Sequence, residues 1–115
     1  MKSKVFLGKT VAVIVDRPLG SKHPHYGYIY PINYGYIPNT LAPDGQEVDA
    51  YILGVFEPLS HFEGDCVAII HRINDTDDKL IVVPQGKNYS DEQILALTEF
   101  QEQFFVSVIL RQHNY

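Results

Sequence analysis

The sequence predicts a mainly β protein in which short strands form a small closed or partly open barrel covered by one C-terminal α-helix. Apolar, strand-like runs separated by turn residues fill the first three-quarters of the chain. A helical pattern of apolar residues follows near the C-terminus. The length of 115 residues favours one hydrophobic core, so we expect a single domain over residues 1–115. An open antiparallel sheet with a helix on one face is the alternative.

Five apolar runs are predicted to form the strands. The first is "KTVAVIVDRP", which is rich in Val and Ile and ends at Pro18, because proline cannot donate to a strand ladder. The next two are "YIYPINYGYIP" and "DAYILGVF". The last two are "CVAIIHRI" and "KLIVVP". The turn residues "EGD" precede the fourth strand, and the acidic turn "NDTDD" separates the fourth from the fifth.

The segment "NYSDEQILALTEFQEQFFVSVILRQ" is predicted to form the helix. Ser90 is a suitable N-cap, and Gln93 three positions later completes a capping box. Apolar residues then recur at steps of three and four, as on a helix that packs against a core. These residues are Ile94, Leu97, Phe100, Phe104 and Val108.

The composition excludes several classes of protein. A formal net charge of −5 argues against a nonspecific nucleic-acid binder. The single cysteine, Cys66, excludes an internal disulfide and a zinc site made of cysteines. No apolar run approaches the ~20 residues that a membrane helix needs, and "MKSKVFLGKT" lacks the apolar core of a signal peptide. We therefore expect a cytoplasmic protein that binds neither nucleic acid nor a membrane.

Two acidic turns are candidates for a metal site. Asp44 and Asp49 flank the turn in "DGQEVD", and Asp75 and Asp77 lie in "NDTDDK". Both turns fall at strand ends, so a barrel could bring them together at one mouth. Clustered carboxylates repel one another unless a cation lies among them, and magnesium and manganese prefer oxygen ligands. Ordinary solvated turns are the alternative, since Asp-Gly and Asn-Asp are common turn pairs.

Basic and aromatic residues offer further candidates. Arg17, Lys22 and Lys79 could each hold a phosphate group. His23 and His25 could ligate zinc, but no third histidine is near in sequence, so exposed loop positions are the simpler interpretation. The abundant tyrosines could pack in the core, or they could line a site and donate hydroxyl hydrogen bonds to phosphate.

Three motifs resemble a known family. The segments "YPINYGYIPNT", "DGQEVDAYILG" and "NDTDDKLIVVP" are similar, in this order, to the soluble inorganic pyrophosphatases of the magnesium-dependent, barrel-forming family. "FQEQFF" resembles the aromatic motif of that family's late helix, so the resemblance covers roughly residues 28–105. It implies a shortened, divergent member with a five-stranded barrel of the oligonucleotide-binding (OB) type and a C-terminal α-helix. The implied activity is hydrolysis of pyrophosphate, or a related phosphoanhydride, to phosphate.

The resemblance also implies site residues. Magnesium, with manganese as the alternative, would be held by Asp44, Asp49, Asp75 and Asp77. Charge on the leaving phosphate would be stabilised by Tyr34 and Lys79. The family's basic residues near the N-terminus have no clear match in this chain, and Arg17 and Lys22 are the candidates for further phosphate contacts there. Members of this family often assemble, so a homo-oligomer is compatible with the sequence.

The chain departs from the family pattern at Gln46. The family has an aspartate there that orients and deprotonates the attacking water, and glutamine cannot accept a proton. General-base help of this kind is worth ~10²–10⁴-fold in rate. Glu47 is the neighbouring candidate, but in an extended chain it faces the other way, so it could substitute only in a reshaped turn.

A second departure falls on the late helix, where Phe104 and Phe105 replace a tyrosine–lysine pair. Three hypotheses are therefore open. The first is a phosphohydrolase of reduced activity that acts on pyrophosphate or a related anhydride. The second is a weakly active or inactive module that binds metal and phosphate, and the third is a structural protein that keeps only the barrel.

Overall fold

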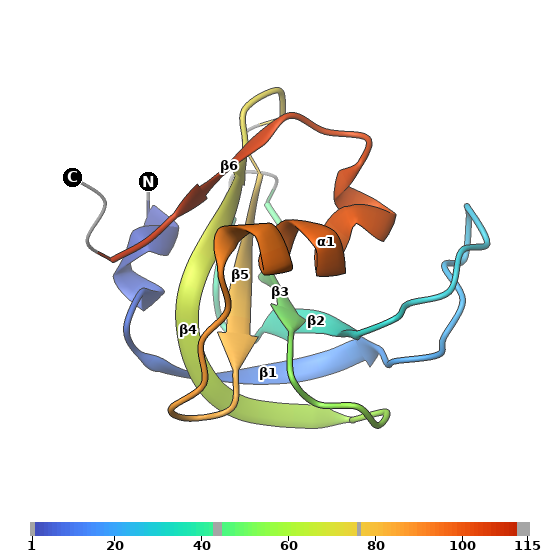
Figure 1. The fold of residues 1–115 in the computed structure, drawn as a ribbon, viewed down its shortest axis with the longest axis horizontal. Coiled ribbons are helices and arrows are strands. Elements are labelled where there is room, and N and C mark those ends of the chain that lie inside the picture. The colour runs from blue at the N-terminus through green and yellow to red at the C-terminus, as the bar shows by residue number, and fades with distance from the viewer. Residues whose placement is uncertain (1, 43–44, 76, 113–115) are drawn as a thin grey trace.

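The computed structural model describes residues 2–42, 45–75 and 77–112 (Figure 1). Its elements in chain order are the 3-10 helix η1 (Lys2–Phe6), β1 (Thr10–Arg17), β2 (Asn33–Ile37), β3 (Val48–Ile52), β4 (His61–Arg72), β5 (Asp78–Val83), α1 (Asp91–Glu102) and β6 (Ser107–Leu110). None of the helices in these described ranges has the length and apolar character that a bilayer crossing requires. The expected cytoplasmic location stays a prediction.

The first five strands close into a barrel. The sheet order is β1-β2-β3-β5-β4, and β1 also pairs with β4, which joins the two ends. The β3–β5 pair is parallel and the other pairs are antiparallel. β6 adds to β4 outside the closed ring. The predicted mainly β, five-stranded barrel with a C-terminal α-helix is confirmed, and the open-sheet alternative is wrong.

Burial along the strands explains why the chain folds this way. In β1 the side chains of Val11, Val13 and Val15 are buried and alternate with exposed neighbours, as expected for a barrel wall with one face to solvent. β5 is buried along its whole length. A second core, which includes Tyr51 and Ile81, packs on the other side against Ile94 of α1. The helix therefore covers one flank of the barrel (Figure 1).

The predicted capping box is confirmed at the start of α1. The Gln93 N–H donates to Ser90 Oγ at 3.1 Å, and the Ser90 N–H donates to Gln93 Oε1 at 2.8 Å. The predicted extent of the helix was wrong, because α1 ends at Glu102 and residues 107–110 form β6. Two residues of the expected apolar stripe, Phe104 and Val108, are exposed. β-branched residues at this point pair with the open edge of β4 instead of continuing the helix.

The predicted "EGD" turn was also wrong, since these residues lie inside the long strand β4. Gly64 pairs with Val11 of β1. A Cβ atom at Gly64 would lie 2.4 Å from the carbonyl oxygen of Val83, so glycine is needed here for close strand approach.

The segment between β1 and β2, residues 18–32, extends from the barrel as a long loop (Figure 1). The buried Asn33 ties its base to the barrel. Asn33 Oδ1 accepts hydrogen bonds from the N–H groups of Leu19 at 2.9 Å and Leu59 at 3.0 Å, and Nδ2 donates to the Glu57 carbonyl at 2.9 Å. This anchoring holds the tyrosine-rich loop against the end of α1.

Candidate functional site

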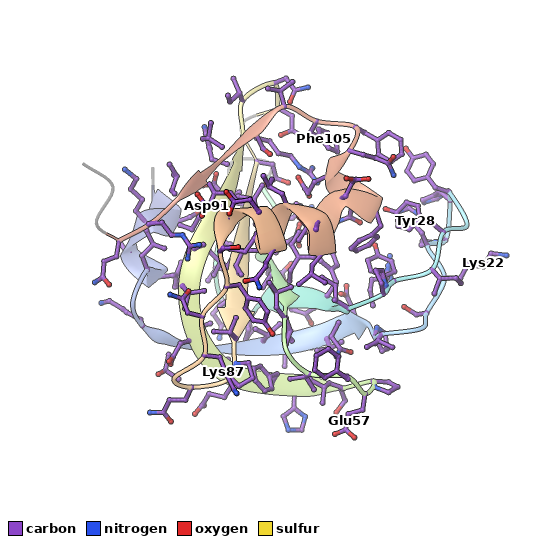
Figure 2. All side chains as sticks on the ribbon, viewed as in Figure 1. Lys22, Tyr28, Glu57, Lys87, Asp91 and Phe105 are labelled. Carbon is purple, nitrogen blue, oxygen red and sulfur yellow. The ribbon has the colours of Figure 1, made fainter. Side chains whose placement is uncertain are left out.

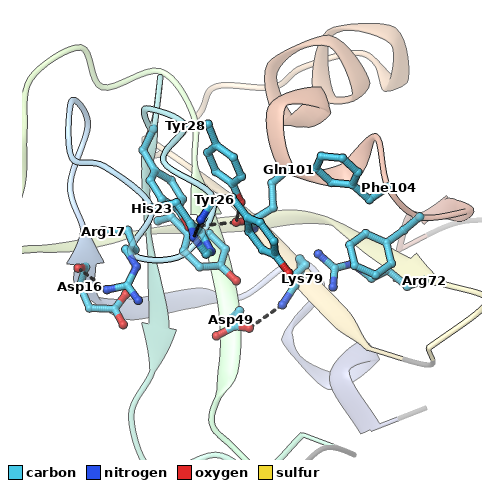
Figure 3. Close-up of a pocket in the computed structure, with 13 residues that line it drawn as sticks. Asp16, Arg17, His23, Tyr26, Tyr28, Asp49, Arg72, Lys79, Gln101 and Phe104 are labelled. Carbon is cyan, nitrogen blue, oxygen red and sulfur yellow. Dashed lines mark hydrogen bonds and ion pairs between the residues drawn. The ribbon is translucent and has the colours of Figure 1, made fainter.

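A pocket of about 590 Å³ opens between the 18–32 loop, the barrel strands and the end of α1 (Figure 3). Its charged lining residues are Asp16, Arg17, Asp49, Arg72 and Lys79. Its aromatic lining residues are His23, Tyr26, Tyr28, Tyr30, Tyr34, Phe104 and Phe105, and Gln101 completes the wall. In Figure 3 the charged residues lie along one side of the pocket, and His23, Tyr26, Tyr28 and Phe104 lie along the other; we call these sides the charged half and the aromatic half. Two aromatic rings belong to the charged half, because Tyr34 lies beside Lys79 and Phe105 beside Arg72.

Lys79 is the centre of the charged half. The parallel pairing of β3 with β5 places Asp49 beside Lys79. The Lys79 ammonium donates to Asp49 Oδ2 at 2.5 Å and to Asp77 Oδ2 at 2.9 Å. Burial lowers the pKa of Lys79, but Tyr34 and the two carboxylates outweigh that effect and raise it above the usual value. Lys79 is therefore a buried, permanently charged cation between two acids.

Tyr34 lies next to this cation. The Lys79 Nζ atom is 5.8 Å from the centre of the Tyr34 ring. Burial raises the pKa of the Tyr34 hydroxyl well above its usual value, although Lys79 opposes the shift. The hydroxyl stays protonated and can donate a hydrogen bond. Gly35 allows this packing, because a Cβ atom there would lie within 1.9 Å of the Ile14 carbonyl oxygen on β1.

Asp16 and Arg17 bring a third acid and a second cation from the end of β1. Partial burial at the rim of the pocket raises the pKa of Asp16, with Arg17 opposing and Asp49 and Glu47 adding to the shift. The sequence reasoning overlooked Asp16. The sequence pointed to Asp16 in one way: it is an acidic residue adjacent to the basic Arg17, just before Pro18, where the strand was predicted to end.

Arg72 is a third cation, which the sequence reasoning also missed. Its guanidinium donates to Glu102 Oε1 at 3.0 Å and to Oε2 at 2.7 Å. Burial lowers the pKa of Arg72, but Glu102 raises it further, so the charge is fixed. Arg72 Cζ also lies 3.7 Å from the centre of the Phe105 ring. Positive charge therefore reaches this side of the pocket from β4. It lies beside Phe105, the position where the family resemblance implied a lysine.

Gln101 organises the aromatic half. Its Oε1 accepts hydrogen bonds from the hydroxyls of Tyr28 and Tyr30, each at 2.9 Å. Its Nε2 donates to the Tyr51 hydroxyl at 2.7 Å, which in turn donates to Glu102 Oε2 at 2.6 Å. Burial raises the pKa of Tyr51, so this hydroxyl keeps its proton. The network joins the loop, the barrel and the helix, and it fixes the orientation of the rings.

Comparison with known proteins identifies the family. A sequence model described as inorganic pyrophosphatase matches residues 7–110. The chain belongs to the inorganic pyrophosphatase family. The inorganic pyrophosphatase of Campylobacter jejuni is 36% identical over 80 residues, which cover 66% of this chain and 44% of that protein. That of Helicobacter pylori is 37% identical over 81 residues, covering 66% and 43%. The matches thus span less than half the length of these curated relatives.

Solved pyrophosphatase structures share the fold. The inorganic pyrophosphatase of Ehrlichia chaffeensis superposes with a TM-score of 0.67 at 20% identity, covering 88% of this chain and 84% of that one. The Helicobacter pylori enzyme gives a TM-score of 0.63 at 22% identity, covering 83% and 75%. At this level of identity the likeness concerns the barrel and its helix.

Four residues predicted to form the pyrophosphatase-like site line the pocket. They are Arg17, Tyr34, Asp49 and Lys79. Asp77 lies beside Lys79 just outside the lining, and the more exposed Asp75 pairs with Arg72 at 3.3 Å.

The other predicted site residues lie elsewhere. Lys22 is exposed, is not among the lining residues and points away from the molecule (Figure 2). Glu47 is exposed, and its negative charge helps to raise the pKa of Asp16. Asp44 lies outside the described residues.

The carboxylates near Lys79 are the candidate ligands for the expected metal. Within residues 2–42, 45–75 and 77–112, no three His, Cys, Asp or Glu side chains are grouped closely enough to hold a metal ion. Asp49 and Asp77 nevertheless converge on one cationic atom, Lys79 Nζ. Their oxygen atoms are the ligand type that a hard divalent cation prefers. This pair of donors therefore fits magnesium chemically, while the full set of four ligands stays a prediction.

Proposed function

We propose that this chain hydrolyses a phosphoanhydride bond in the pocket beside Lys79, with inorganic pyrophosphate as the simplest substrate. The observation that carries the proposal is the buried Lys79 ammonium held between Asp49 and Asp77 at the charged half of an open pocket. Membership of the inorganic pyrophosphatase family supports it. A shared fold does not by itself give this chain the activity of its longer relatives, because it matches less than half of their length.

The cations explain how an acidic chain would hold an anionic substrate. The net charge of −5 repels phosphate at long range. Inside the pocket, Arg17, Arg72 and Lys79 place three positive groups along its lining. Guanidinium and ammonium groups form strong, charge-assisted hydrogen bonds with phosphate oxygens. The protonated hydroxyl of Tyr34 is a neutral donor that would stabilise charge on the leaving phosphate.

Asp49 and Asp77 are the described residues proposed to hold magnesium, with Asp44 and Asp75 as the further ligands implied by the family motif. Bound magnesium would supply charge neutralisation of the phosphates and a more acidic water. The protein's own contribution is to hold Asp49 and Asp77 in place through hydrogen bonds from Lys79 and to place the cations along the pocket lining. Manganese is the alternative ion.

The family motif has its general-base aspartate at the position of Gln46, so another residue must accept the proton in this chain. Glu47 is the candidate from the sequence. Asp16 is the candidate from the structure, since it lines the pocket and partial burial raises its pKa above the usual value. If neither serves, the second candidate function applies: a module that binds metal and phosphate and turns over poorly.

Phosphate release from pyrophosphate with magnesium tests the proposal. Turnover should be catalytic in the wild type and should fall by about 10²-fold or more in Asp49→Asn. Asp65→Asn is the matched control, because Asp65 lies on β4 away from the pocket and makes only long hydrogen bonds of 3.3 and 3.4 Å. Magnesium-dependent binding of pyrophosphate without any release would favour the binding module.

Gln46→Asp separates the two candidate functions further. If the missing carboxylate limits the rate, restoring it should raise turnover by about tenfold or more. An unchanged rate in an active enzyme would show that another group already serves as the base. Asp16→Asn and Glu47→Gln would then identify that group, because only the variant that removes the base should lower turnover.

A further inference from the structure

The pocket as a whole is larger than two phosphate groups require. The whole pocket measures about 590 Å³, within the range of pockets that hold drug-sized organic ligands. Figure 3 shows Tyr26, Tyr28 and His23 on one side of Gln101 and Phe104 on the other. The apolar faces of these rings contribute nothing to pyrophosphate hydrolysis, because phosphate oxygens need donors and cations.

Three rings cluster on this side of the pocket, with His23 tilted by 36° against Tyr26 and by 44° against Tyr28. We call this cluster the His23–Tyr26–Tyr28 platform. The Tyr26 and Tyr28 planes are nearly parallel, with an angle of 9° and centres 6.3 Å apart. The His23 ring lies 4.8 Å from Tyr26 and 4.9 Å from Tyr28. Tyr26 is 78% exposed and Phe104 is 65% exposed, although both line the pocket. An apolar ring that faces an open pocket is a surface on which a flat ligand can stack.

The platform is held in place by contacts within the protein. His23 Nδ1 accepts hydrogen bonds from the N–H groups of His25 and Tyr26, each at 3.1 Å, which fixes the loop around the ring. The Tyr28 hydroxyl is held by Gln101 at 2.9 Å. Binding a flat ligand against His23 and Tyr28 would therefore cost little ordering of these two side chains.

We propose that the substrates of this pocket are nucleoside diphosphates, with the base stacked on the His23–Tyr26–Tyr28 platform and the diphosphate in the charged half. This inference rests on the proposed hydrolysis and narrows its substrate class. Aromatic side chains stack on nucleobases irrespective of base identity. A diphosphate attached to a nucleoside matches a pocket that is charged at one end and aromatic at the other.

The reaction on such a substrate is balanced by water alone. The water oxygen bonds to the terminal phosphorus, and the bridging P–O bond to that phosphorus breaks. The electron pair of the broken bond stays with the leaving nucleoside monophosphate. One hydrogen of the water remains on the released phosphate and the other leaves as a proton, through the general base to solvent.

Calorimetric titration with two matched, non-hydrolysable probes tests the inference in the presence of magnesium. The probes are α,β-methylene-ADP and methylenediphosphonate, which share the bridged diphosphate and differ by the nucleoside. The wild type should bind the nucleoside probe about tenfold or more tightly than the smaller probe, since stacking on one aromatic side chain is worth about that factor. Tyr26→Ala should remove most of this advantage, and Tyr26→Phe should keep it.

Phe56→Ala is the control variant, because Phe56 is 88% exposed and does not line the pocket. It should leave the advantage of the nucleoside probe intact. Equal affinity for the two probes, or an advantage that survives Tyr26→Ala, would overturn the inference. Pyrophosphate turnover together with equal probe affinities would overturn it while leaving the proposed hydrolysis standing. Tight, Tyr26-dependent binding of the nucleoside probe without any turnover would support the ligand class and contradict the hydrolysis.

Discussion

The two halves of the pocket are built by different means. The charged half uses strand register, because the parallel pairing of β3 with β5 sets Asp49 beside Lys79. The aromatic half uses side-chain hydrogen bonds, because Gln101 joins Tyr30 and Tyr51 from segments 71 and 50 residues away in the chain. Groups placed by backbone pairing keep their positions when a neighbouring side chain is changed. Groups placed by a shared side chain lose their positions together.

This difference predicts where the pocket is fragile. The cations of the charged half come from different strands, so the loss of one leaves the others anchored. The aromatic half depends on the adjacent pair Gln101 and Glu102 at the end of α1. Variants of these two residues are therefore the most direct way to disturb the aromatic half.

The largest effect is expected from Glu102→Ala. Arg72 and Glu102 are both largely buried, with side chains 8% and 5% exposed, and the variant leaves the guanidinium without its bidentate partner. Removing one member of a buried ion pair costs about 3–5 kcal/mol of unfolding free energy. Urea denaturation measures this loss. Glu99→Ala, at an exposed position on the same helix, is the control and should change stability by less than ~0.5 kcal/mol.

Gln101→Ala should have a smaller effect on stability. The hydroxyls of Tyr28, Tyr30 and Tyr51 each lose a partner, and an unsatisfied buried polar group costs about 1–3 kcal/mol. Thermal unfolding should show the loss, and the advantage of the nucleoside probe should fall with it. Gln103→Ala is the control, because Gln103 lies two positions later and is exposed; its stability should match the wild type. A fully stable Gln101→Ala protein would show that the network does not hold the rings.

Asp16→Asn tests the charged half through pH. The pKa of Asp16 is raised in the folded chain, so the fold binds its proton more tightly than the unfolded chain does. Stability attributable to this group therefore falls as pH rises from about 3.8 through the raised pKa. The asparagine variant removes that loss, so it should be slightly more stable than the wild type at pH 7, and the difference should vanish at pH 3. Urea midpoints at both pH values measure the effect. A difference independent of pH would contradict the assignment.

The smallest effect is expected from His23. Burial, Arg17 and His25 lower its pKa, and the unprotonated Nδ1 accepts two backbone hydrogen bonds. The stability of the loop attributable to His23 is therefore present above pH 6.5 and is lost as pH falls from there through the lowered pKa. Affinity for α,β-methylene-ADP, measured by calorimetry, should decline below pH 6.5 more steeply than affinity for methylenediphosphonate. His23→Gln should remove this extra dependence.

The sequence predicted the charged half better than the aromatic half for a physical reason. Tyr34, Asp49 and Lys79 lie in short motifs whose spacing along strands carries over to space. Arg72 is held by Glu102, 30 residues away, and Gln101 by partners 50 to 73 residues away, and a local pattern does not reveal such pairs.

The same limit explains the error in the helix. Periodicity cannot tell an apolar residue that faces the core from one that faces solvent. Phe104 and Val108 continued the predicted stripe but are exposed. The chain beyond α1 paired with β4 because an open strand edge was available there, and only the folded barrel shows that edge.

The proposed hydrolysis depends on Lys79 and its carboxylates, which would form the reactive end of the pocket. Steady-state phosphate release from pyrophosphate with magnesium should be compared for the wild type, Lys79→Met and Lys87→Met, with circular dichroism to establish that each is folded. Lys87 lies in an exposed turn outside the pocket. We expect kcat/KM to fall by about 10²–10³-fold in Lys79→Met and to stay at the wild-type value in Lys87→Met. A folded Lys79→Met protein with wild-type turnover would contradict the proposed role of Lys79.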